Sequence, residues 1–355
     1  MPVALNNFFY KLTHWETWHF HAKYIPILPA WIWYCIKSKS LWFFTPSNPT
    51  ITFGGMDGET KEEMYTQLPP GSYPNTIYIN PSMTFDVVEE KIKSAGIIYP
   101  FAVKPNVGMS GFMFRKIEAK EALQLYHSKI SVDYLIQDLI TFPEEVSVFY
   151  YRMPNEQKGT VSGMVRKGSP HVIGDGIATL SDLIHLHSGV RFQLDKVLAR
   201  HSNNLDKILA PGEKYQLSDA SNRSQGAKIE NLKEEIDESL TEFFDKLSHH
   251  SGQFFYGRYD IKCASVKDLK QGENYSILEY NGSGAGTQHI YGNSYTLFQA
   301  WKIILTHWKM LYKISRYNNS QGVRYWNFWS GLTFLREAKK NLKRLKQLDA
   351  EFPVF

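Results

Sequence analysis

The chain contains 355 residues and carries a formal net charge of +5 at pH 7, from 40 Lys and Arg against 35 Asp and Glu. This charge is too small for the length to indicate a nucleic-acid partner. Hydrophobic residues make up 43% and charged residues 21%, which excludes a disordered or collagen-like chain and fits two domains, or one large domain with additions. Aromatic residues reach 15%, including 9 Trp, so many of them must lie in a core or at a boundary between water and an apolar phase.

Cysteine usage and the N-terminal sequence both predict a cytoplasmic protein. Cys35 and Cys263 are the two cysteines, which excludes a disulfide framework and fits a reducing compartment. The first residues, MPVALNNFFYKLTHWETW, lack the basic start, the apolar run and the small-residue cleavage site of a secretory signal.

The longest apolar run, YIPILPAWIWYCI at residues 24–36, has two interpretations. It is shorter than the roughly 20 residues that span a bilayer, and Pro26 and Pro29 further disfavour a spanning helix. The simpler interpretation is an aromatic helix that packs on the rest of the protein. The other is a segment in a membrane interface, which would add a peripheral membrane contact, because lysines flank the run and tryptophans lie inside it: Lys23, Lys37, Lys39, Trp31 and Trp33.

Helix and strand patterns alternate along the chain after an aromatic, weakly charged block over residues 1–55. In the first half of the chain, the spacing of apolar and turn residues predicts helix 59–67, strand 76–79, helix 85–95 with Thr84 as its cap, strands 101–104 and 112–117, helix 118–129, and strands 134–139 and 145–151. The second half is predicted to contain a mostly helical charged segment at 200–245 with a loop near 216–226, and strands 255–264 and 276–280. Helices 294–316 and 333–348 are predicted to follow.

Two acidic residues and an asparagine on the last two strands form the first candidate site. Glu279 and Asn281 lie two apart in ILEYNG, so on a strand they project from the same face, and Asp260 in GRYDIK lies on the preceding strand of an expected hairpin. Carboxylate and amide oxygens suit a hard divalent cation such as Mg²⁺. The alternative is a polar, solvent-facing side of a hairpin, although the apolar neighbours Ile261 and Leu278 would make an unpaired pair of carboxylates costly.

Two further segments have the composition of a nucleotide site. Lys104 closes an apolar strand in FAVKPNVGMSGFMF and precedes a glycine loop, which suits a phosphate cradle because glycines let backbone N–H groups approach phosphate oxygens. An ordinary β-hairpin turn would have a similar sequence. The segment YLIQDLITFPEEVSVFYY could supply an apolar slot for an adenine ring and a carboxylate for a ribose, or be a plain strand–turn–strand.

The order of these segments is more specific than any one of them. Over residues 55–295 the order of motifs resembles that of the ATP-grasp superfamily. The motifs are, in chain order, a lysine before LPPGSYPNT, VKP with a glycine loop, QD followed by E, GDG, GRYD and LEYN. The similarity is to its carboxylate–amine ligases, of the D-alanine–D-alanine ligase and cyanophycin synthetase type. It implies an α+β ATP-grasp fold, in which two α/β subdomains clasp ATP, with an aromatic N-terminal segment at 1–55, a lid subdomain at 56–145, a catalytic and metal subdomain at 146–295 and a helical C-terminal extension at 296–355.

The resemblance also implies how individual residues would bind the nucleotide. Lys61 and Lys104 would contact the phosphates beneath a loop formed by Gly108, Ser110 and Gly111. Glu145 would bind the ribose, and the adenine hinge would comprise Gln137, Asp138, Leu139 and Ile140.

Around the reacting groups, the resemblance places two Mg²⁺ ions, with Mn²⁺ as a substitute, on Asp260, Glu279 and Asn281. Arg258 would sit near the acyl-phosphate and act in catalysis together with Lys104. The candidate contacts for the substrates are Arg166, Asn222, Arg223 and Gly284.

The implied function is that of an ATP-dependent carboxylate–amine ligase that joins small-molecule carboxylate and amine substrates, such as an amino acid or a peptide. A substrate carboxylate would attack the γ-phosphate of ATP, and an amine would then displace phosphate from the acyl-phosphate. Two alternatives remain. One is a nucleotide-binding regulatory or scaffold protein whose ligase activity has decayed, and the other is a ligase docked on a membrane that acts on a hydrophobic substrate.

Two features depart from the family pattern. About 55 aromatic-rich residues precede Lys61, where such ligases carry a full α/β domain, and GSGAGTQ follows Asn281 in place of Ser-Pro-Gly-Met, which argues against D-alanine as a substrate. All 9 Trp lie before residue 55 or after residue 295. We therefore expect the two flanks to pack together as one aromatic module in place of the missing domain.

Overall fold

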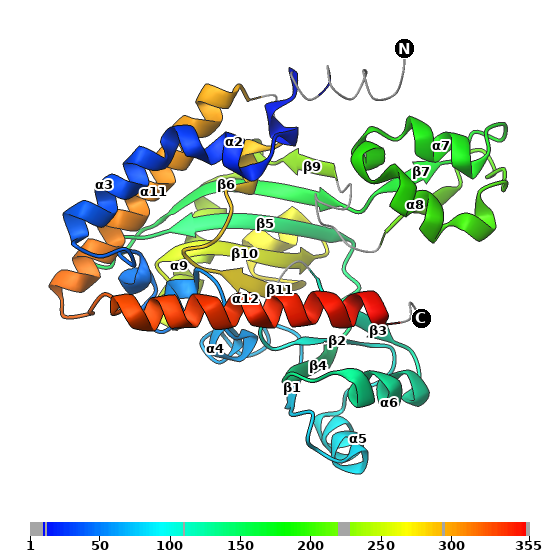
Figure 1. Ribbon diagram of the computed structural model, residues 1–355, viewed down its shortest axis with the longest axis horizontal. Helices are drawn as coiled ribbons and strands as arrows, with labels where there is room; N and C mark the ends of the chain where they lie inside the picture. Colours follow the sequence, from blue (N-terminus) through cyan, green and yellow to red (C-terminus); the bar gives the residue numbers. More distant parts are fainter. Residues whose placement is uncertain (1–9, 11–12, 109–110, 219–227, 293–294, 353–355) are drawn as a thin grey trace.

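The computed structural model describes residues 10, 13–108, 111–218, 228–292 and 295–352, and two antiparallel sheets form its centre (Figure 1). The smaller sheet has the order β1-β4-β2-β3 and consists of β1 (Thr76–Ile79), β2 (Phe101–Pro105), β3 (Arg115–Ile117) and β4 (Tyr134–Asp138). It packs with two helices, α5 (Phe85–Ala95) and α6 (Lys120–Lys129). Apolar side chains of the sheet and of both helices share one core, and β4 is buried over residues 134–137.

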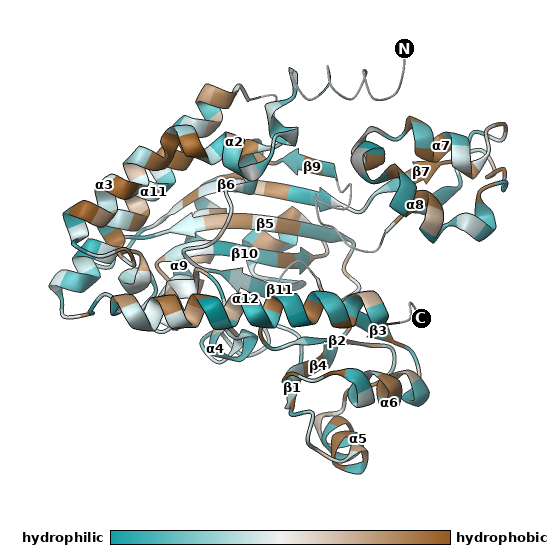
Figure 2. Cartoon of the chain, viewed as in Figure 1, coloured by the Kyte–Doolittle hydropathy of each residue, from teal (hydrophilic) through white to brown (hydrophobic). Residues whose placement is uncertain are grey.

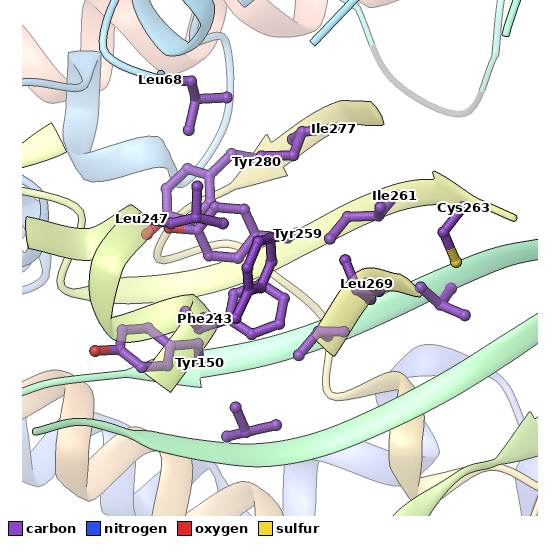
Figure 3. Close-up of a cluster of buried hydrophobic side chains, with 14 of the residues drawn as sticks. Leu68, Tyr150, Phe243, Leu247, Tyr259, Ile261, Cys263, Leu269, Ile277 and Tyr280 are labelled. Atoms are coloured by element: carbon purple, nitrogen blue, oxygen red, sulfur yellow. The ribbon is translucent and has the colours of Figure 1, made fainter. Parts of the chain in front are cut away.

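The larger sheet has the order β11-β10-β5-β6-β9 and consists of β5 (Glu144–Tyr151), β6 (Thr160–Gly168), β9 (Lys228–Asn231), β10 (Tyr256–Cys263) and β11 (Tyr275–Asn281). Two helices pack on one face, α9 (Glu238–Ser251) and α10 (Val266–Gln271), and Figure 3 shows part of the core between them and the sheet. Side chains alternate along β10, so Tyr259, Ile261 and Cys263 point into this core and Asp260 points away from it. The polar residues of β10 are thereby left on the opposite face.

A small unit outside both sheets follows β6 (Figure 1). It has its own core and consists of β7 (His171–Ile173), α7 (Leu180–Leu186), α8 (Leu194–Arg200) and β8 (Lys214–Gln216). The prediction of mostly helical structure over 200–245 is wrong, because β8 pairs with β7, β9 joins the larger sheet, and α9 is the one long helix described there. Leu209 and Leu217 anchor this segment in the small core as single apolar residues, which leaves no periodic pattern in the sequence.

The N-terminal segment and the helices after residue 295 pack against each other (Figure 1). The N-terminal segment contains α2 (Phe20–Tyr24) and α3 (Leu28–Ser38), and the helices after residue 295 are α11 (Leu297–Ser320) and α12 (Phe328–Glu351). The ring centroids of Trp31 and Trp308 lie 5.2 Å apart, and Tyr34 stacks on Tyr312 at 4.6 Å. The two flanks thus form the expected aromatic module, a name used here for residues 13–55 and 295–329, because each flank buries its apolar surface against the other.

Helix α12 runs across the front of the molecule from the aromatic module to the smaller sheet (Figure 1). Near its start, Trp42 Nε1 donates a hydrogen bond to Phe328 O at 3.2 Å. Near its end, Leu345 is buried in the core of the smaller sheet, and Asp349 pairs with Arg115 at 2.9 Å. The helix therefore ties the smaller sheet to the aromatic module, and the prediction of a helical C-terminal extension on a mixed α/β chain is confirmed.

Short helices connect these parts. The helix α4 (Lys61–Tyr65) begins after Thr60, whose side chain accepts a hydrogen bond from Glu63 N and so caps it. The 3-10 turns are Trp15–Thr17, Ile25–Ile27, Thr45–Ser47, Thr52–Gly55, Ser188–Gln193, Ser202–Asn204, Lys233–Glu235 and Gln288–Ile290. Within the described part of the chain, no helix is both long and apolar enough to cross a membrane.

Candidate active site

Two cavities meet where the two sheets approach each other. One has a volume of about 510 Å³ and the other of about 300 Å³. Both are lined by Lys61, Gly108, Lys167, Asp260 and Glu279. The two cavities therefore share a wall of charged side chains, which we call the junction.

Asp260 lies at the centre of the charges at this junction. Its side chain is 9% exposed, and Arg258 donates to both carboxylate oxygens, from Nε to Oδ1 at 2.9 Å and from Nη2 to Oδ2 at 3.0 Å. Lys167 Nζ lies 3.1 Å from Oδ1, and the hydroxyl of Ser147 donates to the same oxygen. Burial opposes ionisation, but Arg258 and Lys167 together hold the pKa of Asp260 well below its usual range, so the carboxylate is charged.

Glu279 lies directly opposite Asp260 in the pairing of β10 with β11. Burial acts to raise the pKa of Glu279, but Lys61, whose Nζ lies 3.1 Å from Oε1, favours the charged form, and the net shift is downward. Asn281 follows two residues later on the same face, with Nδ2 at 3.4 Å from Asp260 Oδ2. The spacing in the sequence thus brings two ionised carboxylates and an amide together.

The oxygens of Asp260, Glu279 and Asn281 fit the preference of Mg²⁺ for carboxylate and carbonyl ligands. Among the residues that the structure describes, no group of three or more His, Cys, Asp or Glu could hold a metal ion. An ion here would therefore need further ligands from water or phosphate, as is usual for Mg²⁺. Basic side chains around the two carboxylates outnumber them and favour a polyanionic ligand: Lys61, Lys104, Lys167 and Arg258.

Lys104 and Tyr65 meet at an irregularity in β11. The register of β10 with β11 shifts just after Asp260, and the carbonyl of Leu278 at this bulge accepts hydrogen bonds from Tyr65 OH at 2.6 Å and from Lys104 Nζ at 3.2 Å. Lys104 Nζ also donates to Tyr65 OH at 3.1 Å. Burial, together with the nearby charge of Lys61, lowers the pKa of Lys104 to about 7. A small change in the surrounding charge is therefore enough to protonate this amine.

The larger cavity extends from the junction to the end of β4. Lys262 Nζ donates to Ile140 O at 3.0 Å, and Lys167 pairs with Glu145 at 3.6 Å, so both sides of the cavity are held in place by lysines. The lining includes the residues expected for an adenine hinge and a ribose contact, and both glycines of the loop: Gln137, Asp138, Leu139, Ile140, Glu145, Gly108 and Gly111. The apolar part of this wall suits a flat heteroaromatic ring.

The residues expected to contact substrates do not all lie together. Arg166 lines the larger cavity, where it pairs with Glu144 at 3.1 Å and Glu230 at 2.9 Å, whereas Gly284 lines the smaller one. A Cβ at Gly284 would collide with the carbonyl of Met56, so the chain passes closely here. Asn222 and Arg223, and Ser110 of the glycine loop, lie outside the described residues.

The smaller cavity is walled by segments from both ends of the chain. Residues 55–61 line one side, and α12 contributes Ala338, Asn341, Leu342 and Leu345. Two buried acceptor oxygens of its lining, Glu59 Oε2 and Gln288 Oε1, have no hydrogen-bond partner. Burial raises the pKa of Glu59 to about 7. Sequence reasoning assigned a role to neither residue: Gln288 ends the GSGAGTQ segment that departs from the family pattern, Glu59 belongs to no motif, and their meeting depends on how the chain packs.

No protein-family model and no curated protein matches the chain. Among solved structures it is similar to a bifunctional glutathione synthetase from Pasteurella multocida, with 15% identity, a TM-score of 0.39, and coverage of 66% of this chain and 34% of that one. It is similar to the D-alanine–D-alanine ligase from Bacillus anthracis, with 14% identity, a TM-score of 0.41, and coverage of 74% and 69%. It is also similar to the ATP-grasp ligase PsnB complexed with minimal precursor, with 14% identity, a TM-score of 0.35, and coverage of 70% and 60%.

The chain spans about a third of the length of the glutathione synthetase. Identities of 14–15% and TM-scores of 0.35–0.41 assign neither an activity nor a substrate, so both are inferred from the residues of this chain.

Proposed function

We propose that this protein is an ATP-grasp carboxylate–amine ligase that activates a substrate carboxylate with ATP through an acyl-phosphate. The observation that carries the proposal is the pair of ionised carboxylates, Asp260 and Glu279, at the junction of two cavities and among a larger number of basic side chains. Phosphoryl transfer between two anions needs this combination, because oxygen ligands hold Mg²⁺ while positive charges offset the repulsion.

ATP is proposed to occupy the larger cavity. The apolar lining and the backbone at 138–140 would take the adenine, Glu145 would bind the ribose, and the phosphates would reach Lys61 and Lys104 at the junction. Two Mg²⁺ ions, or Mn²⁺ in their place, would be held by the carboxylate pair and Asn281. They would supply neutralisation of the charge between the phosphates and the incoming carboxylate.

The chemistry then needs two displacements. An oxygen of the substrate carboxylate attacks the γ-phosphorus, the bond from this phosphorus to the bridging oxygen breaks, and ADP leaves. The amine nitrogen next attacks the acyl carbon, inorganic phosphate leaves, and the nitrogen loses a proton. Arg258 is fixed at the junction by Asp260 and by Gly286 O, to which Nη1 donates at 3.1 Å, and would stabilise the negative charge that develops in both steps.

Carboxylate activation can be tested without knowledge of the natural amine. Hydroxylamine intercepts acyl-phosphates as hydroxamates, so the protein incubated with Mg²⁺-ATP, hydroxylamine and pools of amino acids, peptides and other carboxylic acids should form ADP and a hydroxamate of identifiable mass. ATP binding without turnover in any pool would contradict the proposal. It would favour the alternative, a nucleotide-binding regulatory protein.

Tyr65→Phe tests whether the hydroxyl at the bulge positions Lys104. This hydroxyl contacts Lys104 Nζ at 3.1 Å and lies 3.5 Å from Gln137 Nε2, two side chains on paired strands that line the proposed nucleotide cavity. Loss of one hydrogen bond of about 1 kcal/mol should weaken ATP binding about fivefold, as measured by calorimetric titration. The control is Tyr73→Phe, since Tyr73 stacks on Tyr65 at 4.9 Å, whereas the hydroxyl that contacts Lys104 and Gln137 belongs to Tyr65. An unchanged affinity in Tyr65→Phe would assign the hydroxyl to folding only.

The smaller cavity is proposed to bind the amine. The free oxygen of Gln288 is an acceptor, the Glu59 carboxyl is one in its ionised form, with a pKa of about 7, and Asp57 lines the same space. Buried acceptors call for a donor, and an amine or ammonium group supplies several. The apolar part of the wall on α12 would contact the aliphatic portion of such a substrate.

Glu59→Gln should separate the two half-reactions. It retains the shape but removes the charge, so the KM for the amine should rise at least about tenfold, while formation of the hydroxamate stays close to normal. Glu62→Gln, at an exposed neighbouring position, is the matched control. If Glu59→Gln reduced hydroxamate formation as much as amide formation, Glu59 would belong to the nucleotide or metal side instead.

A further inference from the structure

Helix α3 is apolar on both its inner and its outer side. Its inner side packs in the aromatic module through Trp31, Tyr34 and Cys35. Along its outer side and its two ends, large apolar side chains are exposed by 41–62%, and we refer to these residues as the α3 face: Ile25, Leu28, Ile32, Trp33, Ile36 and Leu41. Figure 2 shows hydrophobic colouring along this helix at the edge of the molecule. A helix with no polar side normally lies in a core or against an apolar phase, so we expect the α3 face to bind a partner or a lipid surface that shields it from water.

The α3 face continues onto the start of α12. An open groove of about 510 Å³ lies between Ile32, Ile36 and Leu41 on one side and Tyr325, Trp326 and Phe328 on the other. Beyond it, Trp329 is 69% exposed. The aromatic rings therefore border the apolar face, which is where Trp and Tyr lie in proteins that contact a lipid interface.

Basic residues predominate in the segments that form this surface. No Asp or Glu occurs between Thr17 and Met56 or between Tyr280 and Arg336, which leaves Glu16 as the acidic residue of the aromatic module. Helix α11, whose Trp308 and Tyr312 contact α3, carries basic residues on its exposed side with the spacing of a single helical face: Lys302, Lys309, Lys313 and Arg316. Lys37 lies at the rim of the α3 face, with Nζ at 5.1 Å from the ring of Trp33.

We propose that the α3 face docks on the surface of an anionic lipid bilayer, with α3 lying in the interface and the basic side of α11 facing the headgroups. Apolar residues that enter the interface and lysines that attract anionic lipids are the two signals that peripheral binding requires. The chain would lie on the membrane rather than span it, since no described helix is long and apolar enough to cross. A protein partner would call for acidic residues opposite α11, whereas an anionic bilayer provides negative charge over the whole face without a matching shape.

Flotation of the full-length protein with lipid vesicles tests this inference and needs no knowledge of the substrate. The protein should float with vesicles of equal parts phosphatidylcholine and phosphatidylglycerol, and much less with phosphatidylcholine alone. Trp33→Glu combined with Ile36→Glu should lose at least about tenfold in vesicle binding, because two charges enter the apolar face. Lys309→Glu with Lys313→Glu should weaken binding only to the anionic vesicles, by about fivefold or more for each residue.

A matched control is available in the small unit. Ile177 and Leu186 are 82% and 80% exposed, so Ile177→Glu with Leu186→Glu changes the same amount of charge on an exposed apolar surface elsewhere. This variant should float like the wild type, and all variants should keep the unfolding temperature and the ATP affinity of the wild type. The inference is overturned if the wild type does not float with anionic vesicles, or if the α3-face variant floats as well as the control. It is also overturned if the α3-face substitutions convert a dimer into a monomer in light scattering while no lipid binding occurs, since a second copy of the chain would then be the cover.

Discussion

Asp260→Asn is expected to lower ADP formation by at least about a hundredfold while leaving ATP binding measurable. The substitution keeps the shape of the side chain but removes the negative charge that accepts two hydrogen bonds from Arg258 and pairs with Lys167. It also replaces a carboxylate of the proposed Mg²⁺ set with a weaker ligand. Hydroxamate formation in a pool of carboxylic acids measures the loss.

The same substitution should destabilise the protein, because Lys167 is 6% exposed and would lose its closest partner at the junction. Breaking a buried ion pair in this way costs about 3–5 kcal/mol, which urea denaturation can measure. Asp260→Asn combined with Lys167→Met removes the cation as well, so it should regain part of the stability without regaining turnover. Recovery of both quantities in the double variant would show that Asp260 has a structural role only.

The pH range in which Asp260 stabilises the fold follows from the direction in which its pKa is shifted. The pKa of Asp260 is lower in the folded protein than its ordinary value of 3.8. Its contribution to stability is therefore complete above that value and is lost as the pH falls below it towards the folded pKa.

ATP binding is expected to take up a proton at Lys104 when the pH is above 7. The pKa of this amine is about 7 in the nucleotide-free site, chiefly because of burial, so a large fraction is neutral at pH 8. Phosphate groups next to Nζ favour the charged form, and protonation must then accompany binding. The affinity should consequently fall as the pH rises from 7 to 9, and calorimetric enthalpies should depend on the ionisation enthalpy of the buffer.

Lys104→Met tests the assignment of that proton. It should weaken ATP binding by about tenfold to a hundredfold, the value of a charge-assisted hydrogen bond, and should abolish the proton uptake. Lys116→Met, at a half-exposed position on the adjacent strand β3, is the matched control and should change neither quantity. Proton uptake that persists in Lys104→Met would place the titrating group elsewhere.

Local patterns were sufficient where side chains on a strand share a face. Glu279 and Asn281 lie two residues apart, and Asp260 meets them because β10 and β11 pair as the hairpin pattern predicts. Lys61, Lys104 and Gln137, which belong to three different motifs, also line the same cavity. The catalytic and binding roles of these residues stay proposals.

Patterns failed where residues meet through packing of distant segments. Lys167 follows no motif, yet it contacts Asp260 because β6 and β10 both flank β5. Tyr65 lies in a segment whose sequence indicates only a buried aromatic residue. Its hydroxyl reaches the site because the bulge after Asp260 exposes the carbonyl of Leu278, to which it donates a hydrogen bond. Single side chains of this kind leave no periodic signal in the sequence.

The 15% aromatic content predicted by itself that the two ends of the chain, which hold all 9 Trp, have to bury apolar surface, and the strand patterns predicted two carboxylates on one face. Only the tertiary structure decided how much of that aromatic surface is covered. The ends pair through Trp31 and Trp308, but the outer side of α3 stays exposed, because one side of a helix packs on its neighbour while the other faces outward. It also decided that α12 walls the smaller cavity, since contacts between residues far apart in the chain depend on the packing of the whole fold.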